Sequence, residues 1–228
     1  MKTNLSAISS FAAVIAISTI GFTLICWAKP EGVTPVEDLM REHGVLRRIM
    51  LIYEKEANDL EKGAAPRYDI IFNAATIVHD FIEDYHEKLE EDHIFPIFEK
   101  AGKLADLTKT LREQHQAGRK LTQSILRLSS QRQAGDKANP DALALAGNLR
   151  AFLKMYRPHA AREDTVLFPA LRGLMSEKAY DELGDKFEDK EHELFGENGF
   201  EKIVAEVEKF EKSLDIYRLS EFTPAGAQ

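Results

Sequence analysis

The sequence predicts an all-α protein: an up-down-up-down four-helix bundle, preceded by an apolar segment and followed by additional C-terminal helices. Over most of the 228 residues, apolar side chains recur at the three- and four-residue spacing of amphipathic helices. No segment alternates in the way that a half-buried strand does. Four long helical stretches are joined by short breaks, and short connections favour antiparallel neighbours in a bundle.

The first helix of the bundle has a well-marked start. Thr34 is a good N-cap, Pro35 suits the first turn, and Glu37 can close a capping box. Gly63 and Pro66 separate this helix from the next one.

The remaining helices follow from the same periodicity and the same kinds of break. Three more long helices are predicted over about residues 68–98, 104–132 and 140–174. A shorter fifth helix opens at Ser176, and a sixth follows Gly199.

These elements divide the chain into three parts. Residues 1–28 are predicted to be a signal peptide or membrane anchor, residues 35–175 the four-helix bundle, and residues 176–214 a helical extension packed on it.

The first part is set apart by its apolar character. Residues 5–28 are uncharged and lie between Lys2 and Lys29, a length that exceeds the roughly 20 residues needed to cross a bilayer. Cys26 and Ala28 place small residues where a signal peptidase inspects the chain, so cleavage and membrane attachment both stay open. Either interpretation predicts an exported protein, periplasmic or otherwise extracytoplasmic.

Charge and cysteine content exclude several classes of function. The net charge is −8, which argues against nucleic acid as a partner because phosphate binding needs a basic face. The single cysteine, Cys26, lies in the apolar segment. Beyond residue 28 there is therefore no disulfide framework, thiolate nucleophile or cysteine metal site.

An internal repeat marks a candidate site. The second and fourth helices share a His-x-x-x-Glu motif followed by Phe-Pro, and the first and third share Leu-x-x-x-His at nearly the same offset. The repeated polar residues are His43, His86, Glu90, His115, His159 and Glu163. His79, His93 and His192 have no partner in the repeat and are not predicted to be ligands.

The spacing of the repeat points to a metal site. His and Glu four residues apart share one helical face, so antiparallel copies bring two imidazoles and two carboxylates together. The two other repeated histidines would complete the set from facing helices. Such a buried cluster would be costly without a cation, and its donors suit iron, manganese or zinc better than calcium or magnesium.

The order His, His-x-x-x-Glu, His, His-x-x-x-Glu resembles the hemerythrin-like (HHE cation-binding) family over about residues 35–175. The resemblance implies a non-haem di-iron centre with a bridging oxygen; zinc or manganese is the less favoured metal. It carries the ligand role over to all six repeated residues, with Glu90 and Glu163 as candidate bridges. Oxygen-carrying hemerythrins have a further His one turn after the third-helix His, and here that position is Arg119.

The departure at Arg119 bears on function. With six-coordinate metals, about two positions stay open, whereas a fifth His would leave about one. Glu87 or Asp164 could fill one, and Arg119 is expected to turn outward or to pair with a carboxylate such as Glu87. The favoured function is binding dioxygen or another small ligand, or sensing or storing oxygen or iron. The alternatives are a di-iron oxidase, peroxidase or nitric-oxide-reacting enzyme, and a metal-free or mononuclear scaffold.

Overall fold

The computed structural model describes residues 33–130, 140–224 and 226. The apolar segment that the sequence assigns to export lies outside these residues. No helix within the described ranges is long and apolar enough to span a membrane.

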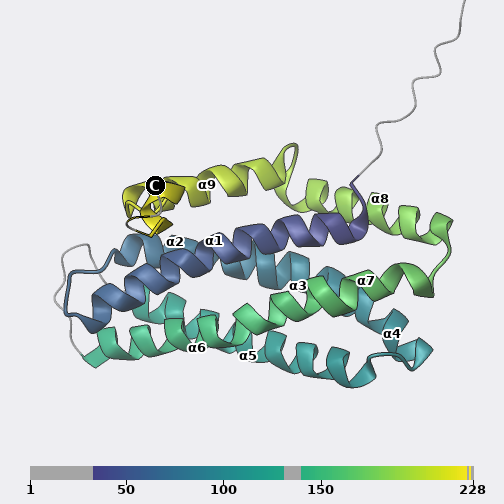
Figure 1. Cartoon of the computed structure of the whole chain (residues 1–228), viewed down its shortest axis with the longest axis horizontal. Helices are drawn as coiled ribbons and strands as arrows, with labels where there is room; N and C mark the ends of the chain where they lie inside the picture. Colours follow the sequence, from purple (N-terminus) through teal and green to yellow (C-terminus); the bar gives the residue numbers. More distant parts are fainter. Residues whose placement is uncertain (1–32, 131–139, 225, 227–228) are drawn as a thin grey trace, which may run out of the picture. The chain divides into compact units, whose positions relative to one another are not determined.

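The described residues form an all-α bundle without any strand, as predicted (Figure 1). The first and third bundle helices are α1 (Pro35–Glu61) and α5 (Ala105–Ser130). The second bundle helix runs through α2 (Tyr68–Ile77), a π-helical segment (Val78–His86), α3 (Glu87–Leu89), a second π-helical segment (Glu90–Ile94) and α4 (Phe95–Ala101). The fourth bundle helix comprises α6 (Pro140–Arg162), a π-helical segment (Glu163–Leu167), α7 (Phe168–Leu171) and a 3₁₀ turn (Arg172–Leu174).

Several helix ends coincide with capping residues. The Thr34 hydroxyl accepts a hydrogen bond from the Glu37 amide at 3.2 Å, and Ser176 caps α8 in the same way. Gly102 ends the second bundle helix with φ of +63°, a conformation that favours glycine.

The sequence did not predict the π-helical segments. Two of them begin at the repeated glutamates Glu90 and Glu163 and end directly before Phe-Pro. Pro96 and Pro169 have no amide hydrogen to donate to the preceding turn, so one bond of the α-helical ladder is missing there. Such widened turns inside α-helices are often found at functional sites.

Two further helices cover one side of the bundle, α8 (Glu177–Phe195) and α9 (Gly199–Ser213). Figure 1 shows both lying along α1. Arg48 of α1 pairs with Glu211 of α9 at 2.5 Å, and the Phe81 and Phe195 rings pack at 5.4 Å. A short 3₁₀ turn (Leu219–Phe222) follows α9.

Candidate metal centre

All four bundle helices contribute to one buried cluster. The six residues that the repeat predicted lie at most 4% exposed: His43, His86, Glu90, His115, His159 and Glu163. They form two groups, one of His43, His86 and Glu90 and one of His115, His159 and Glu163, and each group could hold a metal ion.

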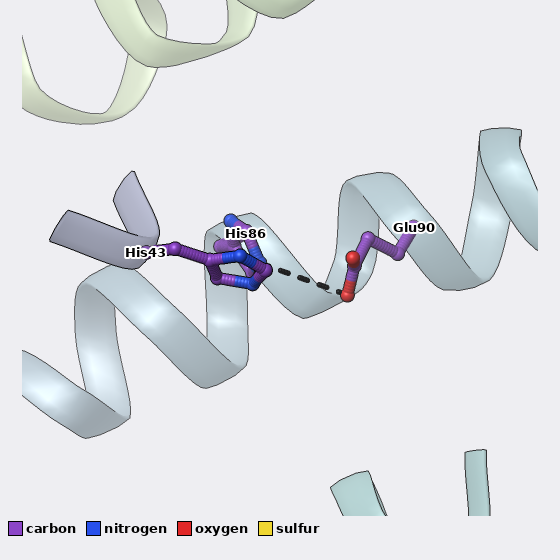
Figure 2. A group of neighbouring side chains, drawn as sticks. All are labelled: His43, His86 and Glu90. Atoms are coloured by element: carbon purple, nitrogen blue, oxygen red, sulfur yellow. Dashed lines mark hydrogen bonds and ion pairs between the residues drawn. The ribbon is translucent and has the colours of Figure 1, made fainter. Parts of the chain in front are cut away.

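In each group, two imidazoles face each other through their Nε2 atoms. The distance is 3.1 Å between His43 and His86 and 3.2 Å between His115 and His159. Two nitrogens that each lie about 2.1 Å from one ion, at a right angle, are about 3 Å apart. Figure 2 shows the His43 and His86 rings side by side, with the Glu90 carboxylate directed toward them.

The two carboxylates lie between the imidazole pairs. Oε2 of Glu90 is 3.7 Å from Nε2 of His86 and 3.4 Å from Nε2 of His115, so it faces both groups. Oε2 of Glu163 is 3.4 Å from Nε2 of His43 and 3.1 Å from Nε2 of His159. This arrangement suits carboxylates that bridge two ions.

The chemistry of the donors fits cations at these positions. None of the four carboxylate oxygens of Glu90 and Glu163 makes an aligned hydrogen bond with a described residue. Burial, together with the charge of Glu163, raises the pKa of Glu90 well above its usual range. Buried, unpaired carboxylates are costly, and a bound cation offsets that cost.

The paired imidazoles show the same demand for positive charge. Burial lowers the pKa of His86 well below its usual range. Burial also opposes charge on His43, but its hydrogen bond to Asp164 and the nearby Glu163 carboxylate raise its pKa to about 9. Burial thus disfavours positive charge on these rings while the adjacent carboxylates favour it, and a bound metal ion would supply positive charge at this place.

A hydrogen bond to the second ring nitrogen fixes each imidazole. Nδ1 of His43 lies 2.7 Å from Asp164, and Nδ1 of His86 lies 2.6 Å from Glu42. An acceptor at Nδ1 places the proton there and leaves Nε2 free for a metal.

The other two imidazoles are held in the same way. Nδ1 of His115 lies 3.1 Å from Glu91, and Nδ1 of His159 lies 2.8 Å from Oε1 of Gln114. Each acceptor adjoins a ligand of one helix in sequence but holds a histidine of the next helix. The four bonds therefore form a closed ring around the bundle, which we call the hydrogen-bond ring.

Sequence reasoning did not find Glu42, Glu91 and Gln114, although the repeat carries a signal for them. Glu42 and Gln114 occupy the same place before a repeated His, and Glu91 and Asp164 the same place after a repeated Glu. The repeat offset that identified the ligands also relates these acceptors.

Glu87, Asp164 and Arg119 are engaged beside the centre. Asp164 forms an ion pair with Arg47 in addition to its bond with His43. Glu87 accepts a 2.6 Å hydrogen bond from the Tyr156 hydroxyl and lies 2.9 Å from Arg119. Arg119 also donates to Glu91 at 2.8 Å, so it takes the carboxylate-pairing course that the sequence allowed.

The histidines outside the repeat lie away from the cluster. His79 is 40% exposed and pairs with Asp80, and the His93 ring packs near Phe187. Neither joins the two metal-binding groups.

Comparison with known proteins agrees with this geometry. The family model described as the hemerythrin HHE cation-binding domain matches residues 34–171, and a second match covers residues 110–222. The chain belongs to the hemerythrin HHE family. Membership confirms the resemblance drawn from the repeat and, with the His/Glu groups, a cation-binding function.

Three mycobacterial proteins are similar to this chain over most of their length. They are the uncharacterized proteins Rv1995 and MT2051 of Mycobacterium tuberculosis and Mb2018 of Mycobacterium bovis. Each is 48% identical over 199 residues, which cover 86% of this chain and 77% of the relative. No solved structure matches the chain.

Proposed function

We propose that this chain binds two iron ions within the bundle and that the centre binds dioxygen or a similarly small ligand. The ligands would be His43, His86, Glu90, His115, His159 and Glu163. One observation carries the proposal: two facing imidazole pairs share two buried carboxylates whose oxygens make no aligned hydrogen bond with the described residues.

The donor set supports iron. A mixture of imidazole and carboxylate suits iron, manganese and zinc, whereas calcium and magnesium prefer oxygen donors alone. Two carboxylates, each facing both imidazole pairs, favour two ions over one. Hemerythrin HHE domains typically hold iron, which makes it the first choice among these metals.

Arg119 supports an open position for an external ligand. When bound, iron supplies reversible electron transfer to a small ligand. A guanidinium has no lone pair to offer a metal, and ion pairs with Glu87 and Glu91 hold this one. Arg119 therefore leaves unfilled the position at which oxygen-carrying relatives place a further His.

Aromatic side chains restrict what reaches the centre. The Phe168 ring stacks on His43 and the Phe95 ring on His115, each with ring centroids 5.5 Å apart. All four residues are buried. This packing shields the centre from bulk water and favours a small ligand.

One observation favours a second function, the reduction of peroxide or nitric oxide by a di-iron enzyme. The buried Tyr156 hydroxyl donates to Glu87, and its ring packs edge-on against His159 at 5.3 Å. A phenol this close to the centre could supply a proton to a reacting ligand.

We also propose that the protein works outside the cytoplasm, either released or anchored to the membrane. The support is the uncharged run at residues 5–28 and the lack of cysteine beyond it. A phosphatase fused after residue 40 should be active only when exported, and activity confined to the cytosol would contradict export.

Metal analysis and visible spectroscopy test the proposed function together. The purified protein should contain about two iron atoms per chain, the number that two bridging carboxylates can join. Its visible spectrum should change reversibly when oxygen is removed and readmitted. Turnover of peroxide or nitric oxide would favour the enzyme instead. One zinc ion and no iron, after expression with iron supplied, would refute a di-iron centre.

A further inference from the structure

A second group of potential metal ligands lies where α1 meets α8, beside the iron-binding cluster but separate from it. Asp38 and Glu42 come from α1, and Glu191 comes from α8. Each offers a carboxylate oxygen, and the three oxygens lie within 4.8 Å of one another. Asp38 is 5% exposed and Glu42 is fully buried, so two of the three negative charges are shielded from water.

Positive charge is scarce in this group. Arg41 reaches Asp38 at 3.6 Å from the rim, where its guanidinium also contacts Glu201 and the Phe200 ring. No described Lys or Arg forms an ion pair with Glu42 or Glu191. Burial and the neighbouring carboxylates raise the pKa of Asp38 to about 7, which shows how strongly the unneutralised group resists charge.

Two buried polar atoms point to a missing ligand. Oε2 of Glu42 accepts from His86, but its Oε1 has no aligned hydrogen-bond partner among the described residues. The Tyr85 hydroxyl, 1% exposed, contacts the Glu42 carboxylate without forming an aligned hydrogen bond, and the charges of Asp38 and Glu191 lie nearby. A phenol oxygen thus borders the carboxylates from the second bundle helix.

We propose that Asp38, Glu42 and Glu191, bordered by the Tyr85 hydroxyl, bind a third metal ion, a hard divalent cation such as Mn²⁺, Mg²⁺ or Ca²⁺. The donors are all oxygen, which selects this class of cation over zinc or copper. Glu191 is only half-buried and opens the site to solvent, and Glu188, one turn earlier on α8, is exposed and adds negative charge there.

The third cation would act on the iron-binding cluster through Glu42. One oxygen of Glu42 would face the cation while the other accepts the Nδ1 proton of His86. The cation would keep this carboxylate ionised and in place, which fixes the orientation of the His86 ring. The site itself does not depend on iron binding.

Two double variants with equal loss of charge test the site. The test variant is Asp38→Asn/Glu191→Gln. Glu191 accepts a hydrogen bond from the Phe200 backbone amide at 2.8 Å, and the side-chain oxygen of a glutamine at this position can still accept it. The control is Asp181→Asn/Glu182→Gln, which neutralises two exposed carboxylates on α8 that belong to none of the potential metal-binding groups. Free Mn²⁺ is measured by electron paramagnetic resonance during titration of the full-length protein as isolated, and circular dichroism checks folding.

The wild type and the control should each bind one Mn²⁺ more than the Asp38→Asn/Glu191→Gln variant, or bind it at least tenfold more tightly. Equal Mn²⁺ binding by all three proteins would overturn the proposal, because the carboxylates would then share protons instead of a cation. His115→Ala, which removes an iron ligand, should keep this Mn²⁺, so that failure of the di-iron centre and failure of this site are distinguishable.

Terbium luminescence gives a second readout that does not require the double variant to fold. Tb³⁺ is a hard cation that emits when a nearby tyrosine is excited. Emission should fall severalfold in Tyr85→Phe, and an unchanged emission would contradict a cation beside this hydroxyl. Tyr68→Phe, which alters another buried tyrosine, is the matched control.

Discussion

Glu90 and Glu163 are buried carboxyl groups whose oxygens make no aligned hydrogen bond with the described residues. Both should therefore favour metal binding and lower the stability of the metal-free protein. A residue kept for its charge at such a place stabilises the bound metal and destabilises the metal-free protein.

Glu90→Gln should separate these two effects. Iron affinity should fall by more than about 100-fold, because even partners of metal ligands contribute 10–100-fold. The metal-free variant should melt at or above the temperature of the metal-free wild type. Iron analysis and thermal melting measure both, with Glu182→Gln on α8 as an exposed control. Equal iron content in the two variants would contradict the ligand assignment.

Arg119→His should add a nitrogen donor where oxygen carriers have one. The expected result is a changed visible spectrum, slower autoxidation and slower reaction with peroxide, because the added ligand occupies the open position. Arg127→His, on the exposed face of the same helix, should leave all three unchanged. An unaltered spectrum with normal iron content in Arg119→His would mean that this residue does not border the metals.

Single residues also show what the sequence could and could not predict. The repeat predicted which six residues come together, because paired positions in a duplicated hairpin meet near its axis. It did not predict that Arg119 would form ion pairs with both Glu87 and Glu91. A long side chain has several acceptors within reach, and only packing selects among them.

At the scale of elements, helix ends were predictable and interruptions were not. Caps at Thr34 and Ser176 and the left-handed Gly102 depend on nearby residues, so a local pattern reveals them. A π-helical turn changes the periodicity too little to appear in a pattern of apolar residues. Its presence depends on the missing proline donor and on packing between helices.

The approach of α5 to α6 depends on Gly118. A Cβ atom there would lie 1.9 Å from the Tyr156 hydroxyl, which is tied to Glu87 within a packed aromatic group. Gly118→Ala should destabilise the protein by about 1–3 kcal/mol, the usual cost of overpacking a core. Gly147→Ala, on α6 with open space around it, should stabilise by about 0.5–1 kcal/mol. Urea unfolding of both variants measures this contrast, and equal stabilities would contradict it.

At the scale of the whole molecule, metal binding should be coupled to folding. A ligand that binds only the folded state stabilises it by about 2.7 kcal/mol at 100 times its dissociation constant. For a domain of this size, removing the metal should therefore lower the melting temperature by about 5–10 °C. Calorimetry with and without chelator measures the shift, which should be absent in Glu90→Gln. A wild type that melts at the same temperature with chelator would indicate that the cluster holds no metal.

The packing of α8 and α9 on the bundle could not be predicted in detail from the sequence. Amphipathic spacing predicts that each helix buries one face, but it does not name the surface that receives it. That choice depends on pairs far apart in sequence, such as Arg48 with Glu211 and Phe81 with Phe195.

The hydrogen-bond ring around the bundle has a consequence for the ancestry of the fold. Its four acceptors and four histidines fall into two equivalent halves, one from each helical hairpin. Neither hairpin can close the ring alone, because one of its two acceptors holds a histidine of its own and the other holds a histidine of the opposite hairpin. Two copies of one hairpin could close it, however, as a symmetric homodimer. The acceptors differ between the halves, with Glu42 against Gln114 and Glu91 against Asp164, and only a chain that carries both hairpins can hold such differences.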